Sequence, residues 1–372
     1  MVDGLSVIVS GGSMGGLFAA LALGEAGHSV DVFERAAGEL EGRGAGIVAQ
    51  PSMLDYLERR GIACRGGYTL TTHRREYLNR DGSLREARSD SMTFTGWDTL
   101  YRRLRDAVVE GRYHEGHVVG FERDGEEVVV RFADGSERRA DLLVIAEGGR
   151  SETREALLPD VSPEYAGYVA WRGLIGERDV PSDLIERFED TFVFFEGERQ
   201  LILGYLIPGP DGETGRGERR LNWVWYDDVR DRERLDELLT DSQGTERDFS
   251  VAPGDLRGEV ERDLRRAAEE EFPDPFSRLV GETREPFVQT IYDLSAPEMA
   301  FGRVCLLGDA AFVARPHTAA GTAKAAADAI GLGAALDGSD PVTALGDWER
   351  ERLAAGRRLV REGIRMGEGY MG

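Results

Sequence analysis

The sequence contains a run of small residues, GGSMGG, shortly after its first residues. At Gly11, Gly12, Ser13 and Gly16 the side chains are small enough for backbone N–H groups to approach a pyrophosphate at the start of a helix. About 20 residues later comes Glu34, whose carboxylate can accept hydrogen bonds from ribose hydroxyls. Because Ser13 stands at the second glycine of the GxGxxG pattern, the match is incomplete. We predict dinucleotide binding, with a glycine-rich turn of an ordinary α/β protein as the alternative.

The segments around this run are those of a βαβ unit. Residues 5–9 form a short β-branched run, residues 17–25 favour a helix that ends at Gly27, and residues 29–33 form a second β-branched run. This order places Glu34 at the end of the second strand, near the glycine run.

The composition argues against several kinds of partner and site. Among 372 residues, 69 are acidic and 46 are basic, and the net charge of −23 argues against nucleic acid or an anionic membrane as partner. Acidic residues are spread along the chain and Lys324 is its only lysine. This composition is typical of the surfaces of halophilic proteins. Cys64 and Cys305 are too few for a disulfide framework, and the five histidines lack metal-ligand spacing, so no metal is predicted. With no membrane-spanning apolar run and no signal segment, we expect a cytoplasmic protein.

Further motifs follow the glycine run in a set order: ER, GRGAGIVAQP, AEGG and GDAAFVARPHTAAGTAKAA. Over nearly the whole chain, this order resembles the single-component flavoprotein aromatic hydroxylases, the family of p-hydroxybenzoate hydroxylase. Within that family, GRGAGIVAQP, YVAWRG, NWVWY and the GDAA segment are most similar to the dihydroxypyridine 3-hydroxylase subgroup.

The resemblance implies FAD as cofactor. It implies that the glycine run holds the FAD pyrophosphate, that Glu34 holds the adenosine ribose and that Asp309 bonds the ribityl chain. Arg43 would reach ribityl or phosphate groups, with a solvated loop arginine as the alternative, and Gly321 would let the backbone approach the flavin pyrimidine. The implied cofactor-binding residues are Gly11, Gly12, Ser13, Gly16, Glu34, Arg35, Arg43, Gly46, Glu147, Gly308, Asp309, Gly321 and Lys324.

Some positions depart from the family's motifs. Glu147 stands where an aspartate is usual, Ile145 where a glycine is usual, Ala323 where an asparagine is common and Trp97 where an arginine is common. These departures motivate one alternative function, a degenerate flavin-fold protein that binds a ligand without turnover.

The resemblance also implies the catalytic residues. Pro316 would lie beside the reactive face of the flavin, and His317 would polarise or deprotonate substrate or peroxide, a task for a group that titrates near neutrality. The alternative for His317 is a residue that only fills the turn. Lys324 lies in the first turn of the next helix, where it is expected to support an anionic reduced flavin or to reach Asp328.

The middle of the chain alternates apolar and polar residues, as antiparallel strands do when one face of their sheet is covered. Trp223 and Trp225 share one face of their strand and Val224 and Tyr226 the other, so only one pair can line a pocket. Arg172 could bind an anionic group of a substrate or bond nearby backbone. The predicted substrate-binding residues are Trp171, Arg172, Tyr205 and Trp225.

The expected fold is α/β, an FAD-binding Rossmann-like domain of the glutathione-reductase type with an inserted antiparallel-sheet substrate domain. Residues 1–70, 96–164 and 288–345 are assigned to the FAD-binding domain, and residues 71–95 and 165–287 to the substrate domain. Residues 346–372 are expected to form a C-terminal helix outside the FAD domain.

For function, the resemblance implies an FAD-dependent monooxygenase that uses NAD(P)H and O2. It would hydroxylate an electron-rich aromatic or heteroaromatic ring through a C4a-hydroperoxyflavin, with a homodimer as the candidate assembly. The other alternative is a flavoprotein reductase or halogenase of the same fold. The WVWYD stretch is similar to the tryptophan pair of halogenases, although no lysine lies between residues 60 and 90.

Overall fold

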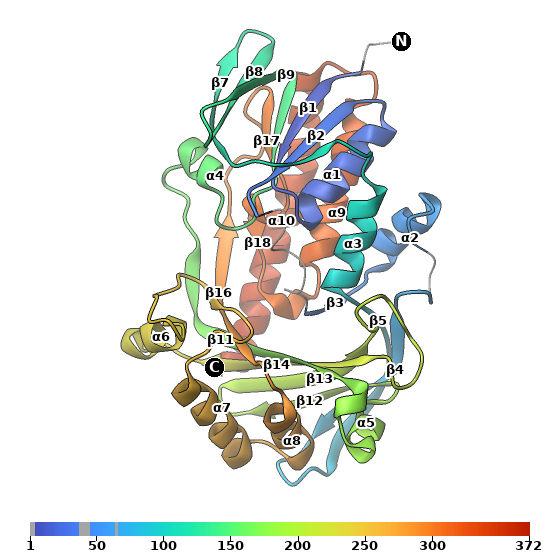
Figure 1. Ribbon diagram of the computed structural model, residues 1–372, viewed down its shortest axis with the longest axis vertical. Coiled ribbons are helices and arrows are strands. Elements are labelled where there is room, and N and C mark those ends of the chain that lie inside the picture. The colour runs from blue at the N-terminus through green and yellow to red at the C-terminus, as the bar shows by residue number, and fades with distance from the viewer. Residues whose placement is uncertain (1–3, 37–44, 64–65) are drawn as a thin grey trace.

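The computed structural model describes residues 4–36, 45–63 and 66–372 (Figure 1). Within these residues, a parallel sheet and a larger, mainly antiparallel sheet lie at opposite ends of the molecule, with helices packed on each. The expected combination of a Rossmann-like domain and a substrate sheet is confirmed.

The parallel sheet forms one half of the molecule. In order across the sheet, its strands are β17 (Val304–Leu306), β10 (Leu142–Ile145), β1 (Ser6–Ser10), β2 (Ser29–Glu34) and β6 (Tyr113–Glu115). The small antiparallel sheet of β7 (Val118–Asp124), β8 (Glu127–Phe132) and β9 (Glu137–Ala140) shares its hydrophobic core. Strands that are buried on both faces of a parallel sheet consist of continuous apolar residues, which explains the β-branched runs of the sequence at β1 and β2.

Two helices of small residues pack against each other beside the parallel sheet. They are α1 (Met14–Glu25) and α9 (Gly321–Leu336), drawn side by side in Figure 1. A Cβ atom on Gly333 of α9 would lie 2.7 Å from the carbonyl oxygen of Ala22 in α1, so this crossing requires a glycine. The close approach fixes the starts of both helices relative to the sheet.

The large sheet forms the other half, in the order β15-β16-β11-β14-β13-β12-β4-β5-β3. Neighbouring strands are antiparallel except β12 and β4, and β18 pairs with β16 off this path. The bounds are β3 (Gly46–Val48), β4 (Leu70–Leu78), β5 (Leu84–Gly96), β11 (Glu164–Gly176), β12 (Thr191–Gly197), β13 (Gln200–Ile207), β14 (Arg220–Asp228), β15 (Ser250–Val251), β16 (Phe287–Ser295) and β18 (Phe312–Val313). One face packs on α5 (Ser182–Phe188), α7 (Gly258–Glu271) and α8 (Asp274–Glu282), drawn below it in Figure 1.

The remaining helices connect these layers. They are α2 (Pro51–Arg59), α3 (Trp97–Ala107), α4 (Glu152–Leu157), α6 (Arg232–Leu239) and α10 (Pro341–Met371), with the 3-10 turns η1 (Glu177–Asp179), η2 (Gly308–Ala310) and η3 (Pro316–Thr318). The long helix α10 begins at Pro341, capped by Asp340, and runs from α9 to β13 and β16. It therefore reaches the large sheet, and the expectation that it packs outside the FAD domain missed this contact.

The predicted domain boundary at 287/288 falls at the start of β16, a strand of the large sheet. The division into domains otherwise stays a prediction. Among the residues described, no helix combines the length and apolarity needed to cross a membrane.

Candidate active site

The glycine run forms a tight turn between β1 and α1. Gly11 has φ +102°, and a Cβ atom on it would lie 2.4 Å from the carbonyl oxygen of Ala146. A Cβ atom on Gly16 would lie 1.8 Å from the carbonyl oxygen of Gly11. No side chain caps α1, because Ser13 at its N-cap makes no side-chain hydrogen bond, so the first N–H groups of the helix stay available for an anion.

Glu34 lies at the end of β2 beside this turn. Its Oε2 accepts a hydrogen bond from the N–H of Gly12 (2.7 Å) and its Oε1 one from the N–H of Ala36 (3.0 Å). Gly12 is also needed for this contact, since a Cβ atom there would lie 2.7 Å from the Glu34 Cβ and 2.4 Å from the Tyr113 hydroxyl. The structure thus brings together the turn and the carboxylate that the sequence predicted to act together.

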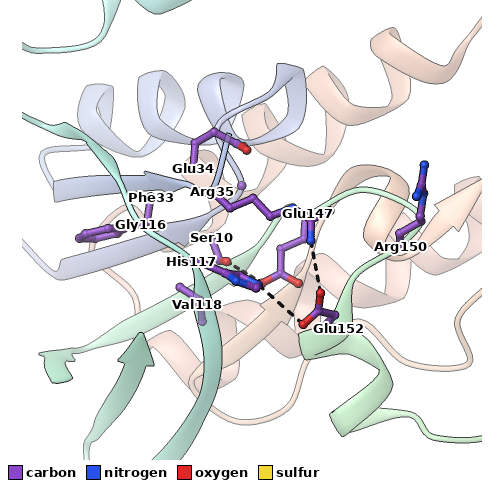
Figure 2. A pocket seen from close by; sticks show the side chains of 11 residues that line it. Ser10, Phe33, Glu34, Arg35, Gly116, His117, Val118, Glu147, Arg150 and Glu152 are labelled. Atoms are coloured by element: carbon purple, nitrogen blue, oxygen red, sulfur yellow. Dashed lines mark hydrogen bonds and ion pairs between the residues drawn. The ribbon is translucent and has the colours of Figure 1, made fainter. Parts of the chain in front are cut away.

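A small cavity of about 50 Å³ opens next to Glu34. Figure 2 shows Arg35 and His117 meeting Glu152 at its edge, with 3.3 Å between Arg35 Nη1 and Glu152 Oε1. The distance between His117 Nε2 and the other Glu152 oxygen is 3.7 Å. Arg35 therefore brings a half-exposed positive charge to the end of the site where the adenosine diphosphate moiety of a dinucleotide would lie.

Glu147 also lines the small cavity, but its carboxylate is bound by the chain itself (Figure 2). One oxygen accepts hydrogen bonds from the hydroxyls of Ser10 (2.5 Å) and Thr153 (2.7 Å). The other accepts from the Ser151 hydroxyl (2.5 Å) and the Thr153 N–H (3.3 Å). These bonds tie the end of β1 to the start of α4. The geometry gives Glu147 a structural role, and its cofactor-binding role stays a prediction.

A second cavity of about 650 Å³ lies between the large sheet and the loops that follow β17 and β18. The sheet contributes mainly apolar side chains, several of them aromatic, and the loops contribute backbone and polar groups. The principal lining residues are Phe192, Phe194, Tyr205, Tyr226, Asp309 and His317. Arg150 lines both cavities, so the two adjoin.

Arg172 is one of two cations among the sheet residues of this cavity; the other, Arg75 of β4, is paired with Asp90 (2.7 Å). Arg172 extends from β11 into the large cavity, and within the described residues its guanidinium makes no hydrogen bond or ion pair, with its Nε buried. Burial raises the pKa of Tyr226 to about 12, and the charge of Arg172 opposes that rise. The pKa of Tyr205 shifts in the same way for the same two reasons. An unpaired cation in an aromatic cavity can bind an anionic group of a ligand.

His317 lines the same cavity, next to Pro316. Its Nε2 lies 2.8 Å from the Tyr168 hydroxyl, and the rings of Tyr168, Tyr226 and Tyr370 surround it. Burial, with the charge of Arg315, lowers the pKa of His317 to about 3. His317 therefore lies in the large cavity, and its catalytic role stays a prediction. The expectation of a group titrating near neutrality is wrong, because burial lowers the pKa of this imidazole and keeps it neutral.

The loop after β17 carries the predicted ribityl ligand. Gly308 has φ +65°, and Asp309 follows it with a half-exposed carboxylate that lines the large cavity. Lys324 Nζ lies 3.2 Å from Asp309 Oδ1 and donates a hydrogen bond to the Phe312 carbonyl. Lys324 is buried beneath the loop and does not line the cavity, so its predicted role toward the flavin stays a prediction.

The alternative partner expected for Lys324 is occupied. Asp328 accepts a hydrogen bond from Arg352 Nε of α10 (2.7 Å) and one from the N–H of Gly308 (3.2 Å). Gly321 begins α9 at the cavity wall with open space around it, as expected for a close approach by a ligand.

Gly46 of β3 closes another side of the large cavity. Its N–H donates to Asn222 Oδ1 (2.8 Å), and a Cβ atom on it would lie 2.8 Å from the ring of Tyr205. Tyr205, predicted to touch substrate, lines the cavity as expected. Arg43, the predicted cofactor ligand just before this strand, lies outside the described residues.

Trp171 and Trp225 were predicted to bind substrate, and this prediction is wrong. Both side chains lie on the far face of the large sheet, where they border a separate surface cavity against α7. Because side chains alternate along a strand, Val224 and Tyr226 face the large cavity instead. Trp223 is also on the far face and donates to the Thr283 hydroxyl (2.8 Å), so the tryptophan pair behind the halogenase alternative is structural.

The C-terminal helix supplies cavity residues that the sequence analysis missed. Met366 and Tyr370 of α10 line the large cavity one helical turn apart. A signal was present in the sequence, since Gly356, Gly363 and Gly367 mark the face of α10 that packs closely on other elements.

The two adjoining cavities suit an elongated dinucleotide such as FAD. At one end, Gly11 and Gly16 form a cradle that a Cβ atom would fill, beside Glu34 and an uncapped helix start. At the other end lies a large aromatic cavity with the N-terminus of α9 at its wall. Fold and site together define a flavoprotein of the Rossmann type with a separate ring-binding sheet.

Comparisons with known proteins agree with this class. The "FAD binding domain-like" family matches residues 165–293 and the "FAD binding domain" family residues 257–363. The chain is 36% identical to 2,6-dihydroxypyridine 3-monooxygenase of Paenarthrobacter nicotinovorans, over 95% of this chain and 88% of that protein. It is 28% identical to an aurachin C monooxygenase/isomerase of Stigmatella aurantiaca, over 99% of this chain and 90% of that one. The solved 2,6-dihydroxypyridine-3-hydroxylase of Arthrobacter nicotinovorans superposes with a TM-score of 0.92 at 35% identity, covering 98% and 92%.

The chain therefore belongs to the FAD-dependent aromatic and heteroaromatic monooxygenases, the hydroxylase family to which its sequence motifs pointed. FAD is its cofactor.

Proposed function

We propose that this protein uses NAD(P)H and O2 to hydroxylate a small, electron-rich ring that binds as an anion, with a hydroxypyridine-like heteroaromatic as the favoured class. The observation that carries the proposal is Arg172, an unpaired cation in an aromatic cavity of about 650 Å³. The 2,6-dihydroxypyridine 3-monooxygenase similar to this chain is named for a substrate of that class. A ring that has lost a hydroxyl proton is both anionic and more electron-rich, so the same charge serves binding and reactivity.

Different residues along the two cavities would bind the two ends of FAD and the substrate ring. The glycine run and Glu34 would hold the adenosine diphosphate end of FAD, and Asp309 with the start of α9 would hold the flavin end. When bound and reduced, FAD supplies the activation of O2. Phe192, Tyr205 and Tyr226 would sandwich the substrate ring and exclude water, and Arg172 would fix its orientation through the anionic oxygen.

Substitution of Arg172 tests this proposal. For Arg172→Met we expect the KM for a hydroxypyridine or hydroxybenzoate substrate to rise roughly 10- to 100-fold, since a hydrogen bond to a charged group contributes about 1.5–3 kcal/mol. Substrate-stimulated NAD(P)H oxidation and the hydroxylated product are measured together. Arg284→Met, on an exposed arginine remote from both cavities, is the matched control. An unchanged KM in Arg172→Met would show that other groups hold the ring, and a yellow protein that hydroxylates no ring of the panel would refute the proposed function.

Other expectations also stay predictions. A salt-adapted acidic surface is supported by the net charge of −23. A cytoplasmic location and a homodimer have no support from that charge, and size-exclusion chromatography across NaCl concentrations tests the homodimer and the salt adaptation.

A further inference from the structure

A continuous set of polar contacts runs behind the large cavity to His317. Asp293 of β16 accepts hydrogen bonds from Arg315, from Nε at 3.0 Å and from Nη2 at 2.8 Å. The Arg315 guanidinium lies 5.5 Å from the centre of the Tyr168 ring, and its positive charge acts on the Tyr168 hydroxyl. The Tyr168 hydroxyl then lies 2.8 Å from His317 Nε2. The three residues behind His317 are largely buried.

The direction of each hydrogen bond in this set follows from the chemistry of its members. A guanidinium has only donors and a carboxylate only acceptors, so Arg315 donates to Asp293 and offers the Tyr168 proton no acceptor. Tyr168 has one hydroxyl proton, and because Arg315 cannot accept it while His317 Nε2 lies 2.8 Å from the hydroxyl, we assign that proton to the bond with His317 Nε2. A neutral imidazole whose Nε2 accepts a hydrogen bond carries its own proton on Nδ1.

The other ring nitrogen is free for a ligand. His317 Nδ1 makes no hydrogen bond to any described residue, and the side chain lines the large cavity. We propose that Asp293, Arg315 and Tyr168 are positioning residues that hold His317 as the Nδ1–H tautomer, so that His317 donates a hydrogen bond to an oxygen of the bound ring. His317 is then a hydrogen-bond donor and not a base. This inference rests on the proposed function only in naming a ring oxygen as the acceptor.

The C-terminal helix is shaped to cover these positioning residues. A Cβ atom on Gly367 of α10 would lie 2.6 Å from Arg315 Nη1 and 2.8 Å from the Tyr168 hydroxyl. At Gly363, a Cβ atom would lie 2.9 Å from the Arg315 backbone nitrogen. The helix therefore shields the hydrogen bonds from water, which would otherwise compete for the Tyr168 proton and release the tautomer.

The tautomer can be measured without substrate. The FAD-loaded protein, with histidine rings labelled with 15N, is studied by two-bond 1H–15N correlation spectra, which distinguish Nδ1–H from Nε2–H rings. His317→Gln identifies the His317 signals among the five histidines, and His73→Gln, at an exposed histidine, is the control. We expect the Nδ1–H pattern for His317 in the unmodified protein and a shift toward Nε2–H in Tyr168→Phe. An Nε2–H ring in the unmodified protein, or an unchanged tautomer in Tyr168→Phe, overturns the proposal.

Two substitutions of His317 test the donor itself. An asparagine amide nitrogen lies close to the position of Nδ1, and a glutamine amide nitrogen lies close to that of Nε2. We expect His317→Asn to keep the KM of the ring substrate within about threefold, and His317→Gln to raise it at least tenfold. Equal losses, or the reverse order, refute the donor role. If the Nδ1–H tautomer is found but no ring is hydroxylated, the proposed function fails while the positioning of His317 stands.

Discussion

Replacing Gly16 by alanine tests whether the glycine run is the pyrophosphate cradle. The new Cβ atom would lie 1.8 Å from the Gly11 carbonyl oxygen and 3.2 Å from a methyl of Val9. Favourable contact needs about 3.5 Å, so the turn or the start of α1 must move by more than 1 Å. Overpacking of this kind costs about 1–3 kcal/mol, and here the shift also displaces the N–H groups that face the phosphates.

Gly24→Ala is the matched control, because Gly24 lies in the same helix with nothing within 4 Å of its added Cβ atom. FAD dissociation constants are measured by quenching of flavin fluorescence, and stability by urea unfolding of the FAD-free protein. We expect Gly16→Ala to weaken FAD binding at least 10-fold and to lower the free energy of unfolding. Gly24→Ala should leave FAD binding unchanged and stabilise the helix by about 0.5–1 kcal/mol. Equal FAD affinities in the two variants would refute the role of Gly16.

Two further predictions concern buried charges. Lys324→Met should lower the free energy of unfolding by about 1–2 kcal/mol in urea titrations, because the Phe312 carbonyl loses a charged donor; an unchanged value would contradict this role. Burial raises the pKa of Asp227 to about 6, above its unfolded value, so the folded state binds the extra proton and Asp227 costs stability increasingly as pH rises from about 4 to 6. Asp227→Asn should therefore stabilise the protein by about 1–2 kcal/mol at pH 7 and hardly at all at pH 4, and an equal effect at both pH values would contradict the shift.

The dinucleotide end of the site could be predicted because its determinants are local. A turn that needs Gly11 and Gly16 must follow a strand and begin a helix, and a carboxylate at the end of the next strand must lie beside that turn. Short-range spacing and the preference of β-branched residues for strands carry this information, so β1, α1 and β2 formed as expected. The motifs around Asp309 and His317 placed those residues at the second cavity for the same reason.

The ring-binding end depended on contacts between distant segments. The alternation of side chains along a strand predicted that Trp223 and Trp225 share a face. Both faces of β14 are apolar, however, so only the packing of α7 and α8 decided which face meets the flavin domain. Lys324 could have reached Asp328 within its helix, yet Arg352 from α10 occupies that carboxylate.

The sequence by itself therefore determined the cofactor class, the order of the elements, and the turn and carboxylate that are predicted to hold phosphate and ribose. The tertiary structure decided which aromatic residues form the cavity and what His317 can do chemically. Burial keeps that imidazole neutral, and its hydrogen-bond partner, Tyr168, lies 149 residues away. Protonation and hydrogen-bond direction depend on the surroundings of a group in space, which residue type and local spacing do not specify.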